Sequence, residues 1–275
     1  MTSIDAFRYD GKRALVVGGA TGMGAAAAKT VAELGGEVVV MDYAPVEFDV
    51  AKTFDVDIRD RAAIDDVLGE LQGPVDAIFA AAGVADGSGV MKANFIGHRH
   101  IIEQLIGGGS MPPGSAVCMI SSVAGLGWEN RIPLLNDFLA TKDFESADAW
   151  IQAHEGTDNY GFSKQAMNCY VARQAYPFLA KGIRINAICP GPTDTPLARA
   201  NADTWLTFAQ DYRDATQTPH LTADQMGNAM VLLNSSAASG INGTSVLVDT
   251  GHVMASLTGS WTPGTPMITA MLGRG

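Results

Sequence analysis

A tyrosine and a lysine stand four residues apart in the segment YGFSK, Tyr160 to Lys164, at the start of an apolar stretch. If that stretch is a helix, one turn brings the two side chains together on one face. A lysine ammonium beside a phenol favours the ionised phenol, so the pair could take part in proton transfer. The simpler interpretation is that Tyr160 packs in the core and Lys164 is exposed. These two residues alone leave both interpretations open.

Short apolar runs rich in β-branched residues alternate with helical patterns along the chain. Their continuous apolar character is typical of strands buried on both faces, as in a parallel sheet. Among the helical patterns, TADQMGNAMVLLNSS opens with Thr222 and Gln225 at the spacing of a capping box. We therefore expect one doubly wound α/β domain over residues 1–275. Its strands are expected at residues 13–19, 37–42, 75–83, 115–122, 182–191 and 244–251, with a weaker seventh at 52–57.

The composition excludes several classes of protein. The chain has 275 residues, 47% of them hydrophobic and 17% charged, as in a folded globular protein. Its formal charge of −11 argues against a nucleic-acid partner or an anionic membrane. No apolar stretch reaches the roughly 18 residues of a membrane span, and MTSIDAFRYDGK at the amino terminus lacks the apolar run of a signal peptide. We therefore expect a cytoplasmic protein with no membrane contact.

The cysteines and histidines indicate no metal centre. Cys118, Cys169 and Cys189 stand in apolar surroundings without the close spacing of metal ligands. We expect them to be reduced core residues, with neither a disulfide nor a metal site. The five histidines are scattered, and none has a partner that the sequence identifies.

A glycine-rich turn follows the first expected strand. Gly18, Gly22 and Gly24 in VVGGATGMG let the backbone approach a pyrophosphate, which the start of the next helix favours. Asp42 ends the second strand, 24 residues after Gly18, where a carboxylate can accept hydrogen bonds from both adenosine ribose hydroxyls. The same carboxylate would repel a 2′-phosphate, and no Arg or Lys lies in GGATGMG or immediately after Asp42. This pattern favours NAD over NADP, although Asp42 could also be a simple turn residue.

Four motifs in order complete a pattern. GGATGMG, the ISS of Ile120 to Ser122, YGFSK, and NAICPGPTDTP from Asn186 to Pro196 together resemble the short-chain dehydrogenase/reductase family. The resemblance runs from about Arg13 to Gly251 and implies a Rossmann-type domain with a parallel sheet of about seven strands flanked by helices. It also extends to DIRDRAAI and to KANFIG.

The resemblance implies catalytic roles for four residues. Tyr160 would be the general acid/base and Lys164 would lower its pKa and bond the nicotinamide ribose, while Ser122 would hold the substrate oxygen. Lowering a tyrosine pKa from about 10 to about 7 requires roughly 4 kcal/mol, which a neighbouring ammonium and an oxidised nicotinamide can supply in a water-poor cleft. Asn94 would orient a water that links Lys164 to solvent. Ser122 could instead be a turn hydroxyl, and Asn94 a residue at a helix kink.

The resemblance also implies the contacts with the cofactor. Thr193 and Thr195 would bond the nicotinamide carboxamide, and Asp57 and Ile58 would contact the adenine. The full cofactor set implied in this way is Gly18, Thr21, Gly22, Met23, Gly24, Asp42, Tyr43, Asp57, Ile58, Ala81, Ala82, Gly83, Tyr160, Lys164, Pro190, Gly191, Thr193 and Thr195.

Three departures from the family pattern stand out. Val17 replaces the family's Thr before the first glycine, and AAAG, Ala80 to Gly83, replaces its Asn-Asn-Ala-Gly. The second change removes side-chain bonds that tie the central strands together, although backbone contacts to a cofactor could survive. Ser122 and Tyr160 are 38 residues apart, far more than the family's usual spacing.

The added segment 126–159 and the carboxyl-terminal tail 252–275 are expected to serve the site or an interface. The segment 126–159 should form one or two short helices, acting either as a substrate lid or as a subunit contact. The apolar tail should dock over the pocket or at an interface. Residues 198–221 would form the other wall of the pocket, and the helix 165–180 would face either a second subunit or the sheet. Residues expected in the wall are Trp205, Leu206, Phe208 and Tyr212.

The insertion, ISSVA and PGPTDTPL together resemble the bacterial 3α-hydroxysteroid dehydrogenase/carbonyl reductase branch of the family. That resemblance implies a bulky, apolar secondary alcohol or ketone, such as a hydroxysteroid, and a homo-tetramer or homo-dimer. Two other functions remain open. One is lyase or epimerase chemistry that uses NAD, for which Glu145, His154 and Glu155 could supply an acid/base pair. The other is a non-catalytic NAD-binding regulatory protein.

Overall fold

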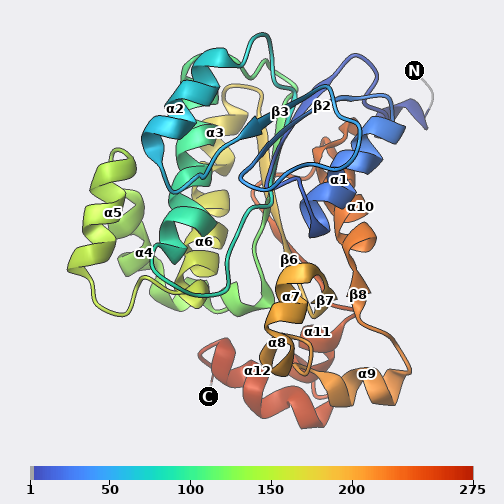
Figure 1. Cartoon of the computed structure of the whole chain (residues 1–275). Coiled ribbons are helices and arrows are strands. Elements are labelled where there is room, and N and C mark those ends of the chain that lie inside the picture. Colours follow the sequence, from blue (N-terminus) through green and yellow to red (C-terminus); the bar gives the residue numbers. More distant parts are fainter. Residues whose placement is uncertain (1–2, 275) are drawn as a thin grey trace.

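The computed structural model of the chain describes residues 3–274, and a parallel sheet of seven strands lies at its centre (Figure 1). All neighbouring strands in the sheet pair in parallel, and their order is β3-β2-β1-β4-β5-β6-β9. This confirms all six predicted strands and the weaker seventh. The strands are β1 (Arg13–Val17), β2 (Glu37–Asp42), β3 (Lys52–Asp55), β4 (Ala77–Ala80), β5 (Ala116–Ile120), β6 (Arg184–Pro190) and β9 (Ser245–Val248).

Helices cover both faces of the sheet, as the doubly wound prediction requires (Figure 1). Along β1 the side chains alternate, so that Leu15 and Val17 enter one apolar cluster while Ala14 and Val16 enter the other. The first cluster includes side chains of α2 (Arg61–Glu70), α3 (Gly97–Gly107) and α6 (Tyr160–Leu179). The second includes side chains of α1 (Gly22–Glu33) and α10 (Ala223–Asn234).

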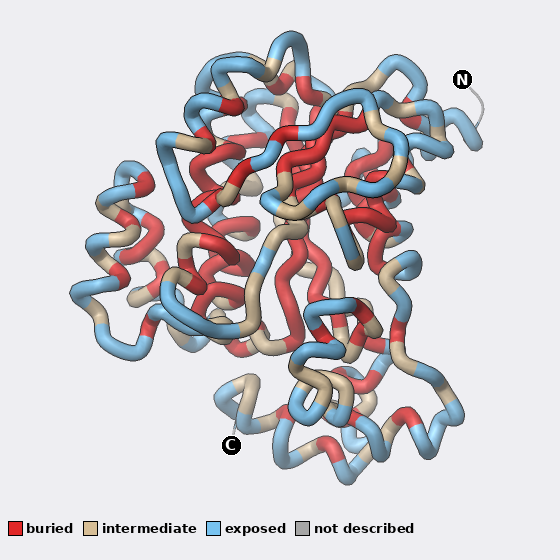
Figure 2. Tube along the Cα trace, viewed as in Figure 1, coloured by how far each residue is buried: buried red, intermediate tan, exposed pale blue. Residues whose placement is uncertain are grey.

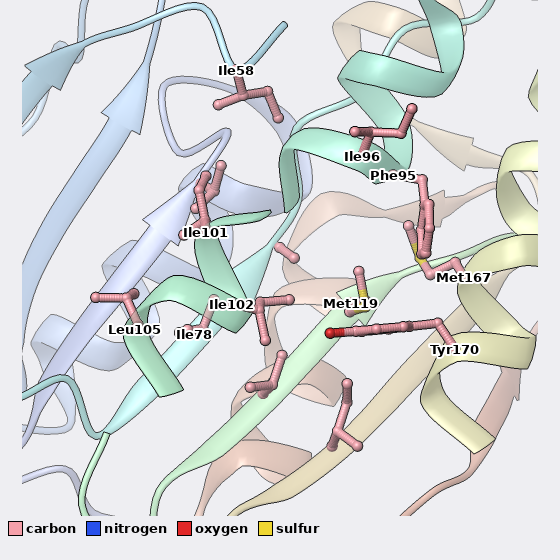
Figure 3. Packing of buried hydrophobic residues seen from close by; sticks show 14 of the residues in the cluster. Ile58, Ile78, Phe95, Ile96, Ile101, Ile102, Leu105, Met119, Met167 and Tyr170 are labelled. Atoms are coloured by element: carbon pink, nitrogen blue, oxygen red, sulfur yellow. The ribbon is translucent and has the colours of Figure 1, made fainter. Parts of the chain in front are cut away.

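The apolar face of α6 packs against the central sheet and α3. Met167 and Tyr170 of α6 lie with Ile102 of α3 and with Met119 of β5 in one buried cluster (Figure 3). Buried residues are concentrated on the central strands and the helix faces turned toward them (Figure 2). One face of helix 165–180 therefore packs on the sheet, and the predicted contact with a second subunit stays a prediction. The three cysteines are free and buried, as predicted.

Local sequence signals set the ends of the flanking helices. The Thr222 hydroxyl accepts a hydrogen bond from the Gln225 backbone N–H at 3.2 Å, and the Gln225 side chain accepts one from the Thr222 N–H at 2.9 Å. This is the predicted capping box at the start of α10. Within residues 3–274, no helix combines the length and apolar character needed to cross a membrane.

The segment 126–159 packs against its own domain. It forms the helical turn Trp128–Arg131 and the helices α4 (Ile132–Leu139) and α5 (Phe144–Ala153). Leu135, Phe138 and Ile151 are buried in the same cluster as α3 and α6, because their apolar side chains complete that side of the core. Ion pairs from Arg61 to Glu145 and from Lys92 to Asp148 hold α5 in place, both at 2.9 Å.

A smaller layer lies beyond the carboxyl ends of the strands (Figure 1). It contains α7 (Pro196–Ala200), α8 (Ala202–Trp205), α9 (Gln210–Thr216), α11 (His252–Leu257) and α12 (Thr265–Met271), with the paired two-residue strands β7 (Thr193–Asp194) and β8 (Leu221–Thr222). Single helical turns elsewhere are Asp5–Phe7, the π-helical Lys92–Ile96, Val123–Gly125, Ser236–Ala238 and Thr262–Gly264.

The carboxyl-terminal tail docks on this layer. Ile268 of α12 is buried against Val123 and Val253, and the Asn130 side chain donates a hydrogen bond to the Leu272 carbonyl at 2.7 Å. The first residues of the segment 126–159 therefore hold the end of the chain beside the carboxyl end of β5.

The turn after β9 contains a strained residue. Thr250 has φ 57°, in the left-handed region, which is unfavourable for a β-branched side chain. Its carbonyl accepts a hydrogen bond from the Tyr212 hydroxyl at 3.1 Å, so the turn is tied to α9.

Thr250→Gly should stabilise the protein by about 1 kcal/mol, because glycine adopts this conformation without a clashing Cβ. The midpoint of thermal unfolding should rise by about 2–4 °C for a domain of this size. Thr250→Ala is the control, since it removes the hydroxyl but keeps Cβ. It should raise the unfolding midpoint by less than Thr250→Gly does. A lower unfolding midpoint in Thr250→Gly would contradict the inference that Thr250 is strained.

Candidate active site

Two cavities adjoin at the carboxyl ends of the central strands. One, of about 330 Å³, lies at the ends of β1 and β2, and the other, of about 230 Å³, lies over the end of β5 and the start of α6. Met23, Thr195 and the turn Ala81–Gly83 line both. The cavities meet beside the neighbouring strands β1 and β4, where the strand order reverses and doubly wound sheets bind their ligands.

In the glycine-rich turn, the backbone of Gly18, Gly22 and Gly24 lines the first cavity directly. Gly18 has φ 85°, and a Cβ built on it would lie 2.2 Å from the Ala82 nitrogen. Only glycine can therefore stand there. The start of α1 faces the same cavity, where its unpaired N–H groups favour an anion.

Asp42 lies at the far side of this cavity. Its Oδ2 accepts a hydrogen bond from the Ala20 N–H at 2.8 Å and its Oδ1 accepts one from the Ala44 N–H at 2.9 Å. The carboxylate is thus a turn residue, as one interpretation held. It also keeps further acceptor capacity toward the cavity, because each carboxylate oxygen accepts more than one hydrogen bond.

The remaining residues predicted for the adenosine end line the same cavity, together with one that the sequence analysis missed. Tyr43, Asp57 and Ile58 lie there, and so does Arg59. The guanidinium of Arg59 pairs with the Asp57 carboxylate at 2.6 Å, which holds the pKa of Asp57 below its usual range. Of the described residues that line this cavity, Arg59 alone is cationic, and its charge is already matched by Asp57.

The turn after β4 is supported by side chains from the helical segment 92–107. Asn94 is fully buried; its amide accepts from the Val84 N–H at 2.7 Å and donates to the Val84 carbonyl at 3.0 Å and to Ser163 Oγ at 3.2 Å. The His98 ring lies 2.8 Å from the Ala82 carbonyl. The support that AAAG removes from the turn itself is therefore supplied from the neighbouring helix.

Asn94 lies in the π-helical turn Lys92–Ile96, which agrees with a residue at a helix kink. Its side chain does not line either cavity, because Val84 and Ser163 occupy its amide. The predicted role in orienting a water therefore stays a prediction.

Ser122, Tyr160 and Lys164 line the second cavity together. Ser122 follows β5, and Tyr160 is the first residue of α6, whose start is capped by the Asn159 side chain at 2.9 Å from the Phe162 nitrogen. One turn further on, Lys164 is buried, and its Nζ lies 5.3 Å from the centre of the Tyr160 ring. The ammonium donates a hydrogen bond to the Ile120 carbonyl at 2.7 Å, so the end of β5 and the first turn of α6 are joined.

Burial shifts the pKa of both residues of this pair. Burial is the main influence on Tyr160 and raises its pKa, against a smaller lowering through the Ser122 side chain. Burial also lowers the pKa of Lys164, to about 8. In the protein alone the Tyr160 pKa is therefore raised, because removal from water outweighs the Ser122 side chain, and the predicted depression, which also requires an oxidised nicotinamide, stays a prediction.

The loop after β6 supplies four further residues to the second cavity: Pro190, Gly191, Thr193 and Thr195. The Thr193 hydroxyl donates to the Gly191 carbonyl at 2.9 Å, and Thr195 Oγ1 accepts from the Ala198 N–H at 3.2 Å. Both threonines thus shape the loop and the start of α7 while facing the cavity. All of the predicted cofactor residues line one cavity or the other.

The outer wall of the second cavity is apolar and in part aromatic. Trp205 and Phe208 line it as predicted, and the Trp205 ring lies 4.9 Å from the Tyr160 ring. Leu206 and Tyr212 do not line it, because Tyr212 turns away to pack against Trp261 and His252. Met271 of the docked tail also lines the cavity, a residue that the sequence analysis did not single out.

The segment 126–159 contributes no residue to either cavity, and its predicted role as a lid or subunit contact stays a prediction. Glu145 pairs with Arg61, and the His154 ring stacks on Trp150 at 3.7 Å, both away from the site. Among residues 3–274, Lys164 is the sole charged residue that lines the second cavity. No cluster of acidic, histidine or cysteine side chains within residues 3–274 could hold a metal ion.

Comparison with known proteins gives a consistent result. The family described as short chain dehydrogenase matches residues 12–133, and the one described as enoyl-(acyl carrier protein) reductase matches residues 145–252. Cis-4-hydroxycyclohexanecarboxylate dehydrogenase of Sinomonas cyclohexanicum is 30% identical over 87% of this chain and 95% of its own. The 3-alpha-hydroxysteroid dehydrogenase/carbonyl reductase of Comamonas testosteroni is 28% identical over 86% and 95%.

The fold has solved counterparts. The 3-alpha-hydroxysteroid dehydrogenase of Pseudomonas sp. B-0831, solved with NADH, has a TM-score of 0.69 at 22% identity, covering 91% of this chain and 99% of its own. Other solved neighbours include complexes with NADP. The arrangement of Ser122, Tyr160 and Lys164 at the cleft, the matched families and these relatives agree. The chain belongs to the short-chain dehydrogenase/reductase family, whose members are oxidoreductases that use a nicotinamide dinucleotide.

Proposed function

We propose that the protein is an NAD-dependent oxidoreductase that interconverts an uncharged, apolar secondary alcohol and its ketone. The observation that carries this proposal is the meeting of Ser122, Tyr160 and Lys164 in a cavity that opens onto the dinucleotide cleft. A bound nicotinamide dinucleotide accepts or donates the hydride and, when oxidised, brings a positive charge to the cleft.

Each of the three residues has a distinct task. In alcohol oxidation Tyr160 accepts the hydroxyl proton, and in ketone reduction it returns that proton to the oxygen. Ser122 donates a hydrogen bond to the substrate oxygen while negative charge develops there. Lys164, buried and anchored on the Ile120 carbonyl, keeps a positive charge within reach of the phenolate.

The lining of the cavity supports an uncharged substrate. Apart from Lys164, it offers only apolar, aromatic, hydroxyl-bearing and backbone groups, among them Trp205, Phe208 and Met271. A carboxylate buried there would lack a counter-ion other than the lysine that serves Tyr160. A bulky alcohol such as a hydroxysteroid, the substrate class in the name of the Comamonas relative, fits this chemistry better than a hydroxy acid.

Neither of the other two functions has support from the site. Lyase or epimerase chemistry needs an additional acid/base pair, and Glu145, His154 and Glu155 all lie outside the cavities. A purely regulatory protein has no need of the complete set of Ser122, Tyr160 and Lys164. The cytoplasmic location and the homo-dimer or homo-tetramer stay predictions.

The choice of NAD over NADP rests on charge. Asp42 points a carboxylate at the end of the cleft where a 2′-phosphate would lie, and Arg59 is already paired with Asp57. A phosphate group would therefore meet a negative charge without an available cation.

Tyr160→Phe should reduce turnover at least about a hundredfold, because general acid/base catalysis contributes factors of about 10²–10⁴. NAD binding should be retained. Turnover is followed at the absorbance band of the reduced nicotinamide with a hydroxysteroid, a monoterpenol and small secondary alcohols. Tyr176→Phe is the matched control, since Tyr176 lies on the same helix and is 82% exposed. Full activity in Tyr160→Phe would contradict the proposed role.

Asp42→Asn should lower the preference for NAD, measured as the ratio of the dissociation constants for NADP and NAD, by about tenfold, which corresponds to roughly 1.4 kcal/mol. The ratio is informative because damage to the turn held by Asp42 weakens both cofactors alike. Calorimetric titration of the wild type and the variant gives both constants. A wild type that prefers NADP, or a ratio unchanged in the variant, would refute the charge argument.

A further inference from the structure

The turn Ala81–Gly83 forms part of both cavities, yet it carries no polar side chain. Its backbone is held on one side by β1, where the N–H groups of Ala81 and Ala82 both donate to the Val17 carbonyl at 2.8 Å. Gly18 lies so close that there is no space between it and the Ala82 backbone. The position of this turn therefore decides the shape of the cleft where its two halves join.

His98 contacts the same turn from α3. It lies on α3, one helical turn after Asn94, and is 1% exposed. Its Nε2 is 2.8 Å from the Ala82 carbonyl oxygen. A carbonyl can only accept, so Nε2 must carry the proton.

The state of the ring is fixed by its surroundings. Burial, chiefly, lowers the pKa of His98 to about 4, so the ring is neutral near pH 7. With the proton on Nε2, Nδ1 is a bare acceptor, and it has no partner among the residues that the structure describes. The ring thus has one hydrogen bond, and that bond goes to the wall of the cleft.

We propose that His98 is a positioning residue for the cofactor, whose Nε2–H holds the Ala82 carbonyl and thereby fixes the Ala81–Gly83 backbone against which the dinucleotide lies. The inference rests on the proposed function only in requiring that a nicotinamide dinucleotide occupies this cleft. It does not depend on the substrate.

The hydrogen bond from His98 satisfies the Ala82 carbonyl. Ala82 is only partly buried. A partly buried carbonyl that loses its donor still pays part of its desolvation cost, so the Ala82 peptide would turn to find another donor. Because Gly18 packs directly on Ala82, a turned peptide changes the surface of the cleft. Loss of the His98 bond should therefore appear first in cofactor binding.

His100 provides a matched control in the same helix. It is 6% exposed, and its Nε2 lies 2.6 Å from the Asp65 carboxylate of α2. It lines neither cavity. A purely structural role for buried histidines in α3 would make the two positions respond alike.

The test compares His98→Phe, which removes the donor, with His98→Gln, whose amide can donate at a similar reach, and with His100→Phe. For each, the dissociation constant of NAD is measured by calorimetry and the unfolding midpoint by circular dichroism. His98→Phe should weaken NAD binding about tenfold, the size expected for one buried hydrogen bond. His98→Gln should restore most of the affinity, and His100→Phe should lower the midpoint without changing NAD binding.

Two results would overturn the inference: unchanged NAD binding in folded His98→Phe, or equal weakening in His98→Phe and His100→Phe. Nitrogen-15 spectra of the wild type test the bond without any variant, since they should show the His98 proton on Nε2; a proton on Nδ1 would contradict it. If wild-type protein binds neither NAD nor NADP, the proposed function fails and the cofactor role of His98 fails with it. A failure confined to the His98 variants leaves the proposed function intact.

Discussion

Two ionisable side chains, the half-buried Tyr160 and the buried Lys164, lie side by side where the end of β5 meets the first turn of α6. Removal from water disfavours both charged forms, which raises the pKa of the phenol and lowers that of the ammonium. Under the proposed function, Tyr160 becomes a base only when more positive charge enters the cleft. An oxidised nicotinamide would supply that charge, so we propose that cofactor binding and activation of Tyr160 are coupled through electrostatics. The anchoring of Lys164 on the Ile120 carbonyl keeps the ammonium in place for this purpose.

The rest of the fold encloses Tyr160 and Lys164 and holds the backbone of the surrounding turns in place. Seven parallel strands end at one edge, and α7, α8 and the docked tail contribute to the wall of the second cavity. Met271, held through the Asn130–Leu272 hydrogen bond, brings the end of the chain into the wall beside Val123. At the turn shared by the two cavities, Gly18 packs against the Ala82 backbone and His98 bonds to the Ala82 carbonyl.

Much of this was predictable from sequence because strand ends and glycine turns follow local rules. Periodicity and turn residues identify the strand ends and helix starts on which the glycine turn, Asp42, Ser122 and the Tyr160–Lys164 pair lie, and the family resemblance singles out Ser122, Tyr160 and Lys164 among them. The contributions that escaped prediction depend on contacts between distant segments. Met271 lines the cavity because the tail is docked through the packing of Ile268 on Val123. The segment 126–159 is part of the core because Phe138 and its apolar neighbours pack against α3 and α6. For His98 a signal existed: it follows Asn94 by one helical turn, opposite a turn that lacks polar side chains.

The most direct test of the central claim is the pKa of Tyr160 itself, measured by ultraviolet difference titration of wild type against Tyr160→Phe, with and without NAD⁺. Burial should hold this pKa above the ordinary tyrosine value of about 10 in the protein alone. With NAD⁺ bound, the added positive charge should bring it below that value. A Tyr160 pKa that stays above the ordinary value in the NAD⁺ complex would contradict the coupling of cofactor charge to the catalytic base.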